Sequence, residues 1–259
     1  MPRDSPVHAA DARLKFVLVL ATIVALALLP VGSFAAMAIA FGVLTVASAS
    51  AHLGPFRLAR GAFVALPFLL AAVPLIFMRE GDPLATWQLG PMQLTVHGEG
   101  VRQFGTIAGK SWLSVQAALL LTYTTPFHEL VDALRKLRVP EVMVSIIGFM
   151  YRYLSVLADE AARLIRARAS RSAAVPGRRS GGSLGWRARV AGGMVGTLFL
   201  HSYERSERIY AAMLARGFTG TFRHFHGRDL TTGEWMAAAL LLAGLAAFEL
   251  AAQLWLPRA

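Results

Sequence analysis

The sequence predicts an all-α integral membrane protein. Hydrophobic residues make up 56% of the 259-residue chain, and the mean hydropathy is +0.52, which is too apolar for an ordinary soluble domain. The apolar residues gather in membrane-length segments that alternate with basic stretches. We expect about five transmembrane helices plus long cytoplasmic amphipathic helices: a membrane region at 1–125, a cytoplasmic helical region at 126–233 and a final transmembrane helix at 234–259.

The first apolar stretch predicts a helical hairpin. Its two arms, Leu14–Leu29 and Phe34–Ser50, are each near the short end of the spanning range. They are joined at Pro30–Gly32, which contains turn-forming residues. The basic start of the first arm is typical of a signal peptide, but the apolar character continues to Ala51 and argues against cleavage.

The third and fourth predicted spans are Gly61–Met78 and Thr106–Thr125. The third contains Pro67 and Pro74, which a membrane helix tolerates at the cost of kinks. The connection between these spans contains WQLGPMQLTV, which predicts a small β-hairpin. Lys110 falls in the fourth span and can reach the membrane interface if it lies near the start of the helix.

The last predicted span is Glu234–Leu256, with Trp235 and Trp255 near its two ends as interfacial anchors. Glu249 lies within this span, and an acid at membrane depth is a candidate functional group. Its position about two turns from the end of the span favours a place near the outer interface instead.

The region 126–233 carries three helical patterns. The segment His128–Pro140 is short and amphipathic, whereas Pro140–Arg171 and Trp186–Arg216 each begin apolar and become charged. Between the last two, Ala174–Gly185 has the composition of a flexible connector.

The apolar stretch Val142–Ala158 in this region is an alternative span. Arg152 near its middle argues against contact with lipid but allows burial in a bundle. We therefore interpret this stretch as the membrane-proximal half of one long tilted helix.

The distribution of basic residues predicts the orientation. With five spans, the basic residues before the first span, between the second and third, and throughout 126–233 all lie on one side, while the loop between the third and fourth spans is nearly neutral. The amino terminus is therefore expected in the cytoplasm and the carboxyl terminus outside.

The segment His201–Gly220 predicts a helix with two distinct faces. Gly217 is the residue that helices prefer just past their last turn, so the helix is expected to end at Arg216. Spacings of three and four residues separate a packed face from a wet, basic face. The packed face holds Tyr203, Tyr210, Met213 and Leu214, and the basic face holds Arg205, Arg208, Ala212 and Arg216. Glu204 precedes Arg208 by four residues, a favourable order for an ion pair.

A second segment, Asp159–Ser172, follows the same pattern at an offset of 45 residues (216 minus 171). This offset pairs Asp159 with Glu204 and Arg163 with Arg208. It also places Ser170, Arg171 and Ser172 over Ala215, Arg216 and Gly217. An arginine between small residues can enter an acidic groove of a partner, because its neighbours add no bulk. The alternative is an ordinary solvated cation that complements the helix dipole.

These two segments, with MYRYLSVLADEA before the first, resemble the transmembrane T component of energy-coupling-factor transporters, and within it the CbiQ branch associated with cobalt uptake. That family carries two Ala-Arg-Gly-type motifs at the ends of cytoplasmic coupling helices. Here the second motif is intact, whereas the first has serines in place of alanine and glycine. The resemblance implies that the residues of both motifs dock ATPase subunits. It also implies that neighbouring charged residues support the coupling helices, namely Asp159, Arg163, Glu204, Arg205 and Arg208.

The resemblance also implies partners and location. Two ATP-binding ATPase subunits are expected beneath the coupling helices, and a membrane substrate-binding S subunit, CbiM-like and with or without a small CbiN-like subunit, against their apolar faces. ATP and magnesium would be bound by the ATPases, so no cofactor and no catalysis are expected in this chain. The expected location is the bacterial inner membrane, in contact with lipid. Cobalt is the expected substrate, with nickel or a vitamin as alternatives because selectivity lies in the S subunit.

Several other sites and functions find little support in the sequence. The segment GTIAGKS has Phe104 where a phosphate-binding loop requires glycine. His224 and His226 have no nearby acid or thiol partner and are interpreted as a solvated pair. Cysteine is absent, which excludes disulfides and thiolate metal sites. The net charge of +11 does not follow an aromatic-lined groove, so nucleic acid is not expected as a partner.

Three alternative functions stay open. A conventional ABC permease would form the substrate path itself and bind substrate without partners. A membrane enzyme acting on lipid or polyprenyl substrates would need a cluster of acids or a metal site. A membrane-anchored nucleic-acid binder would lose affinity steeply with salt.

Overall fold

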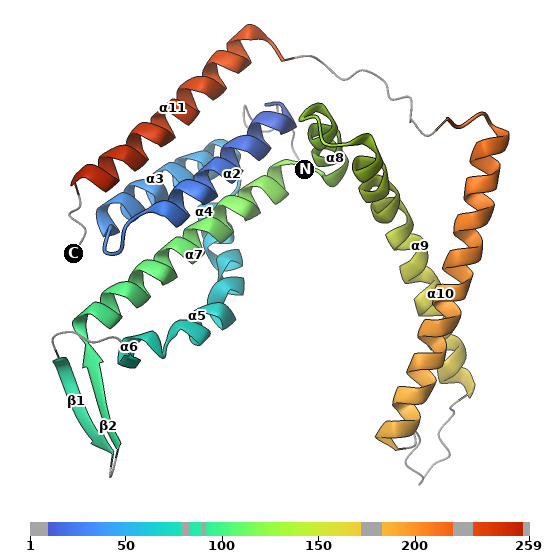
Figure 1. Cartoon of the computed structure of the whole chain (residues 1–259), viewed down its shortest axis with the longest axis horizontal. Helices are drawn as coiled ribbons and strands as arrows, with labels where there is room; N and C mark the ends of the chain where they lie inside the picture. Colours follow the sequence, from blue (N-terminus) through green and yellow to red (C-terminus); the bar gives the residue numbers. More distant parts are fainter. Residues whose placement is uncertain (1–9, 79–82, 90–91, 172–182, 220–229, 256–259) are drawn as a thin grey trace. The chain divides into compact units, whose positions relative to one another are not determined.

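The computed structural model describes residues 10–78, 83–89, 92–171, 183–219 and 230–255. These residues form helices and one two-stranded hairpin (Figure 1), so the predicted all-α membrane class is confirmed. They divide into two compact units, the first comprising Met1–Ala133 with Arg228–Ala259 and the second Leu134–Gly227.

The predicted helical hairpin at the start of the chain is confirmed. Helix α2 covers Ala12–Leu28 and helix α3 covers Phe34–Ser50. The turn between them requires glycine, because Gly32 has a φ of 85° and the guanidinium of Arg102 occupies the space where a Cβ would lie. The Gly32 amide also donates to the buried hydroxyl of Thr106 at 2.9 Å, which fixes the turn against a later helix.

The third predicted span is broken into short helical pieces, and both predicted kinks are confirmed. Pro67 lies in the first turn of helix α5, and Pro74 precedes helix α6. The four pieces are α4 at Pro55–Gly61, the 3-10 helix η1 at Ala62–Ala65, α5 at Leu66–Ala72 and α6 at Leu75–Met78.

The predicted β-hairpin is also confirmed. Strands β1 (Pro83–Leu89) and β2 (Met92–His97) pair antiparallel. Helix α7 follows at Gly98–Thr124 and begins before the predicted start of the fourth span. The segment Gly105–Ser111 lies inside this helix, so it is not a phosphate-binding loop. Lys110 lies about three turns from the start of the helix, and its reach to the membrane interface stays a prediction.

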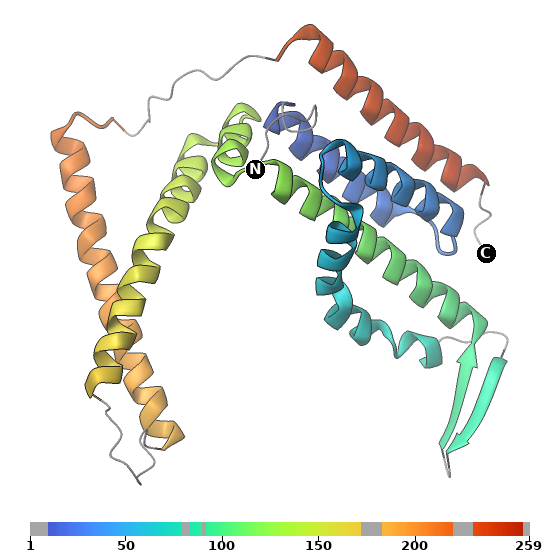
Figure 2. The same cartoon turned by 180° about the vertical axis from the view of Figure 1, so that it is seen from behind.

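Helix α7 is the centre of the first unit. Helices α2, α3 and α4 pack on it, and helix α11 (Thr232–Trp255) packs on α2 (Figures 1 and 2). The helices bury a shared apolar core, because packing their apolar side chains together removes them from contact with water. This core includes Leu26, Leu29, Met37, Leu44, Leu58, Leu113, Ala117 and Leu120.

Two lysines join α2 and α7 in a reciprocal way. The Lys15 ammonium of α2 donates to the carbonyl of Thr124, the last residue of α7, at 3.4 Å. The Lys110 ammonium of α7 donates to the carbonyl of Ala27 at 3.1 Å and to that of Leu29, at the end of α2. Each lysine thereby satisfies carbonyls that the helix itself leaves without a donor, at the end that favours positive charge.

Glu249 lies in α11, where its carboxylate accepts a hydrogen bond from the Gln253 amide at 3.0 Å. Its other oxygen is buried and has no hydrogen-bond partner among the described residues. The structure contains no membrane, so the expected place of Glu249 near the outer interface stays a prediction.

Three described segments are long and apolar enough to cross a membrane: Phe56–Met78, Glu141–Arg171 and Thr232–Leu254. Phe34–Ser50 is a shorter apolar helix. The second segment is a single helix that contains Val142–Ala158, so the predicted long helix is confirmed. The same helix is long and apolar enough to cross a membrane, so the alternative span also stays open. The total of five spans stays a prediction.

We expect Gly32→Ala to destabilise the protein by about 1–3 kcal/mol. The turn holds this residue at a positive φ, which alanine adopts only with strain, and the new Cβ displaces the Arg102 guanidinium. The measurement is the thermal unfolding midpoint of the detergent-solubilised chain. The matched control is Gly42→Ala in α3, where a Cβ meets nothing within 4 Å. An equal midpoint for the two variants contradicts the role of the turn.

Candidate functional site

The second unit contains two long antiparallel helices. Helix α9 covers Glu141–Arg171 and helix α10 covers Leu184–Ala215. Ser183 begins α10 by accepting a hydrogen bond from the Trp186 amide on its side-chain oxygen at 3.3 Å. The helices cross near the end of α9 and diverge toward the start of α9 and the end of α10 (Figures 1 and 2).

Glu160 of α9 is the polar centre of this crossing. Its carboxylate pairs with Arg163 on the same helix. Across the helix pair it lies 3.4 Å from His201 Nδ1 and 3.5 Å from an Arg205 guanidinium nitrogen. The hydrogen bond from Arg163, and then that from His201, lower the pKa of Glu160 below its ordinary value, so the carboxylate is charged at neutral pH.

A second contact joins the helices closer to the connector. The Arg168 guanidinium lies over the Trp186 ring, 5.8 Å from its centroid. At this distance the cation and the aromatic face attract each other. The two contacts together fix the half of the helix pair that is nearest to residue 171.

The predicted faces of the second helix need correction. Arg205 does not lie on a wet, basic stripe, because it contacts Glu160 and is 31% exposed. Tyr203 and Leu214, placed on the packed face by the sequence, are at least half exposed. The side turned to α9 carries Ser202, Arg205 and Ile209, together with Met213, which the sequence placed correctly. Sequence spacing assigns an arginine to the side that faces water, whereas this one faces an acid.

Glu160, which the sequence did not single out, is the acid that contacts Arg163. Asp159 is exposed, and its supporting role stays a prediction. The predicted pair of Glu204 and Arg208 is confirmed, since their charged atoms lie 4.0 Å apart. Both side chains are more than 60% exposed, so this pair stabilises the helix only slightly.

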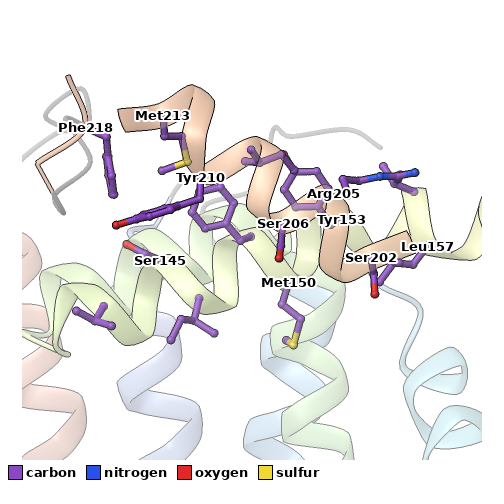
Figure 3. A pocket seen from close by; sticks show the side chains of 15 residues that line it. Ser145, Met150, Tyr153, Leu157, Ser202, Arg205, Ser206, Tyr210, Met213 and Phe218 are labelled. Carbon is purple, nitrogen blue, oxygen red and sulfur yellow. The ribbon is translucent and has the colours of Figure 1, made fainter. Parts of the chain in front are cut away.

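Between the diverging halves of α9 and α10 lies an apolar groove of about 530 Å³ (Figure 3). Its walls carry Phe149, Met150 and Tyr153 of α9 opposite Ile209 and Met213 of α10. Met150 and Val142 on its edge are more than 60% exposed. An exposed apolar surface of this kind is typical of an interaction site.

The end of α10 holds Arg216 in a defined backbone geometry. The Gly217 amide donates to the Leu214 carbonyl at 2.9 Å, and the Phe218 amide donates to the Met213 carbonyl at 3.0 Å. With Gly217 at a φ of 80°, this is a Schellman motif. The predicted helix end is therefore confirmed, and Ala215, Arg216 and Gly217 are all exposed.

The other arginine, Arg171, is the last residue of α9 and is exposed. The Ser170 hydroxyl before it is bound to its own helix, donating to the Ala167 carbonyl at 2.9 Å. Ser172 lies outside the described residues, as do His224 and His226. Because the helices are antiparallel, Arg171 and Arg216 lie at opposite ends of the pair, and α10 with its 32 residues is about 48 Å long.

The family model described as "CbiQ: Cobalt transport protein" matches residues 3–226. The chain belongs to the CbiQ family. This confirms the resemblance that the two small-Arg-small segments carried. Relatives of the chain include proteins named as transmembrane components of energy-coupling factor transporters.

Members of the CbiQ family among known proteins are similar to this chain over long stretches. The cobalt transport protein CbiQ of Rhodobacter capsulatus is 28% identical, with 63% of this chain and 65% of the relative covered. The energy-coupling factor transporter transmembrane protein EcfT of Heliobacterium modesticaldum is 26% identical, with 95% of this chain and 92% of the relative covered. The nickel permease LarQ of Lactiplantibacillus plantarum is 29% identical, with 58% of this chain and 49% of the relative covered.

The alignment with the Rhodobacter capsulatus protein covers 165 residues, which is 63% of this chain. The chain spans about half to two thirds of the length of several curated relatives that it matches, this CbiQ protein among them. It spans most of the length of the EcfT relative. The similarity therefore extends over both units of the structure and includes the paired helices.

We expect Glu160→Gln to loosen the helix pair, because the amide carries no charge to attract His201 and Arg205. The chain has no cysteine, so spin labels can be attached selectively at Met143→Cys and Leu214→Cys, two exposed positions on the diverging halves. The distribution of distances between the labels should broaden.

The matched control for this experiment is Asp159→Asn, which removes the same charge from the exposed neighbouring residue. Because the pKa of folded Glu160 is lowered, its contacts are present above the ordinary carboxyl value of 4.5 and are lost as the pH falls through the lower folded value. Acidification of the unsubstituted chain should therefore broaden the distribution as well. Equal distributions for Glu160→Gln and Asp159→Asn at neutral pH contradict the role of Glu160.

Proposed function

We propose that this chain is the transmembrane coupling subunit of an energy-coupling-factor importer. In this proposal it transmits motion from two ATPase subunits to a membrane substrate-binding subunit, in the bacterial inner membrane and with its amino terminus in the cytoplasm. Membership of the CbiQ family supports the transporter role. The observation that carries the coupling role is the placement of Arg171 and Arg216, exposed at opposite ends of one helix pair.

Opposite ends favour two separate docking sites over one. A helix pair about 48 Å long is too long for both arginines to enter the same groove, so each arginine would bind a different ATPase subunit. The guanidinium suits an acidic groove because its planar fork pairs with carboxylates in a bidentate way. In this role ATP and magnesium belong to the ATPases, and the chain itself carries no catalytic group.

The contacts of Glu160 give the helix pair a point about which motion can be transmitted. The helices are joined at Glu160 and beyond it toward the connector, and they diverge on the other side. When the two ATPases close on nucleotide, a shift of the docked ends would change the angle between the helices. That change would alter the width of the apolar groove between them.

The substrate-binding subunit would cover this apolar groove. Its walls include exposed Val142, Ile146 and Met150, which water hydrates poorly and an apolar helix of a partner can bury. A partner bound there would be moved whenever the groove changes its width.

Cobalt is the substrate that we propose for the complete transporter, by analogy with the relative whose name is cobalt transport protein CbiQ. Nickel is the second candidate, because another relative is named nickel permease. Among the described residues no three His, Asp or Glu side chains come together as metal ligands. We therefore assign selection of the ion to the partner subunit. Specific binding of cobalt by the purified chain alone would favour a conventional permease instead.

We expect Arg216→Glu to weaken strongly the association with one of the two ATPase subunits. The substitution places an acid against an acidic groove, and loss of a buried charge pair at an interface costs about 2–5 kcal/mol. The measurement is co-purification of the ATPases with the tagged chain in detergent, with the amount of chain in the membrane as a check on insertion.

The matched control is Arg166→Glu, which makes the same change of charge at an exposed position of the same helix pair. This variant should retain the ATPases. If Arg216→Glu retains them equally well, Arg216 does not dock them.

Arg171→Glu tests the second docking site independently. Because Arg171 lies at the other end of the pair, we expect each single variant to leave one ATPase contact intact and the double variant to lose both. The measurement is the number of ATPase subunits per chain by native mass spectrometry. Complete loss with Arg216→Glu alone, and no loss with Arg171→Glu alone, contradicts the two-site arrangement.

A further inference from the structure

A second cavity lies within the first unit, away from the paired helices. It has a volume of about 500 Å³ and is enclosed by α2, α3, α7 and α11. Small-molecule sites typically have volumes of about 300–1,000 Å³. Its floor includes Leu44, Ala117 and Leu120, which are at most 7% exposed. The cavity is thus deep enough to hold part of a ligand away from its surroundings.

The rim of this cavity is apolar and exposed. Ile39 and Val43 of α3 and Leu240 of α11 are all more than half exposed. In a membrane protein such a rim lies among lipid tails, because water would hydrate it poorly. A ligand that enters across this rim therefore comes from the bilayer.

A charged group lies at one end of the cavity. Lys15, near the start of α2, lines this end, and its ammonium donates to the carbonyl of Thr124 at the end of α7. The rest of the lining is almost entirely apolar. The cavity is therefore apolar along its length and carries a positive charge at one end.

We propose that this cavity binds one phospholipid. Its acyl chain lies among the four helices, and its phosphate lies next to Lys15. An amphiphile with an apolar chain and an anionic group matches a cavity that is apolar along its length and carries an ammonium at one end.

The length of the cavity fits a section of an acyl chain. On α7 the lining runs from Ala117 to Thr124, and on α11 it runs from Leu240 to Phe248. These stretches are about 10–12 Å long in a helix. The bound chain fills space between α11 and the other helices, where α11 packs directly on α2. The lipid therefore fixes α11 against the bundle.

The test measures phospholipid retained by the purified full-length chain. Gly244→Phe fills the cavity, because Gly244 lines it and a Cβ there meets nothing within 4 Å. We expect native mass spectrometry to find a phospholipid on the unsubstituted chain, and the bound fraction to fall at least about tenfold in the variant, since the ring takes the place of the acyl chain. The matched control, Gly42→Phe in α3, also has open space but does not line the cavity and should retain the lipid.

The headgroup is tested on the unsubstituted chain with lipids of equal acyl composition. Phosphatidylethanolamine and phosphatidylglycerol, which both carry a phosphate, should be retained more than diacylglycerol, which has none. Equal retention by Gly244→Phe and Gly42→Phe overturns the site. Equal retention of the phospholipids and of diacylglycerol overturns the contact with Lys15. These outcomes are independent of ATPase docking, because none involves Arg171 or Arg216.

Discussion

Glu160 is the carboxylate on which the arrangement of the second unit depends. It lies on one long helix and attracts His201 and Arg205 of the other, while Arg163 of its own helix keeps it charged. Much of the remaining surface of the pair is exposed, including large apolar side chains that no described residue covers. The two helices can therefore be joined firmly at one place and still diverge elsewhere, which is what a coupling element requires.

The first unit is stabilised by a different constraint. Helix ends in or near a membrane have few water molecules to satisfy their last carbonyls, so the protein must supply donors of its own. Lys15 and Lys110 supply them reciprocally between α2 and α7. Gly32 and Thr106 then fix the turn that follows α2. These contacts give a firm bundle, and the proposed phospholipid occupies the space that this bundle leaves beside α11.

The two units thus offer surfaces of different kinds. The second unit presents an apolar groove and two exposed arginines, and both suit partner proteins. The first unit presents a cavity whose exposed rim is apolar and whose charged lining residue, Lys15, lies at one end, which suits a phospholipid. In the proposed transporter, the first unit anchors the chain in the bilayer and the second unit carries the moving contacts.

The sequence by itself determined the membrane class, the first helical hairpin, the kinks at Pro67 and Pro74, and the helix end at Gly217. These features follow from hydropathy and from residues that restrict the local backbone. Only the tertiary structure decided that Arg205 faces Glu160 and that Lys110 binds the end of α2. Both depend on which helix lies opposite. A charged side chain that is normally solvated turns inward when a neighbouring helix offers it a charge or a free carbonyl, and sequence spacing does not contain that neighbour.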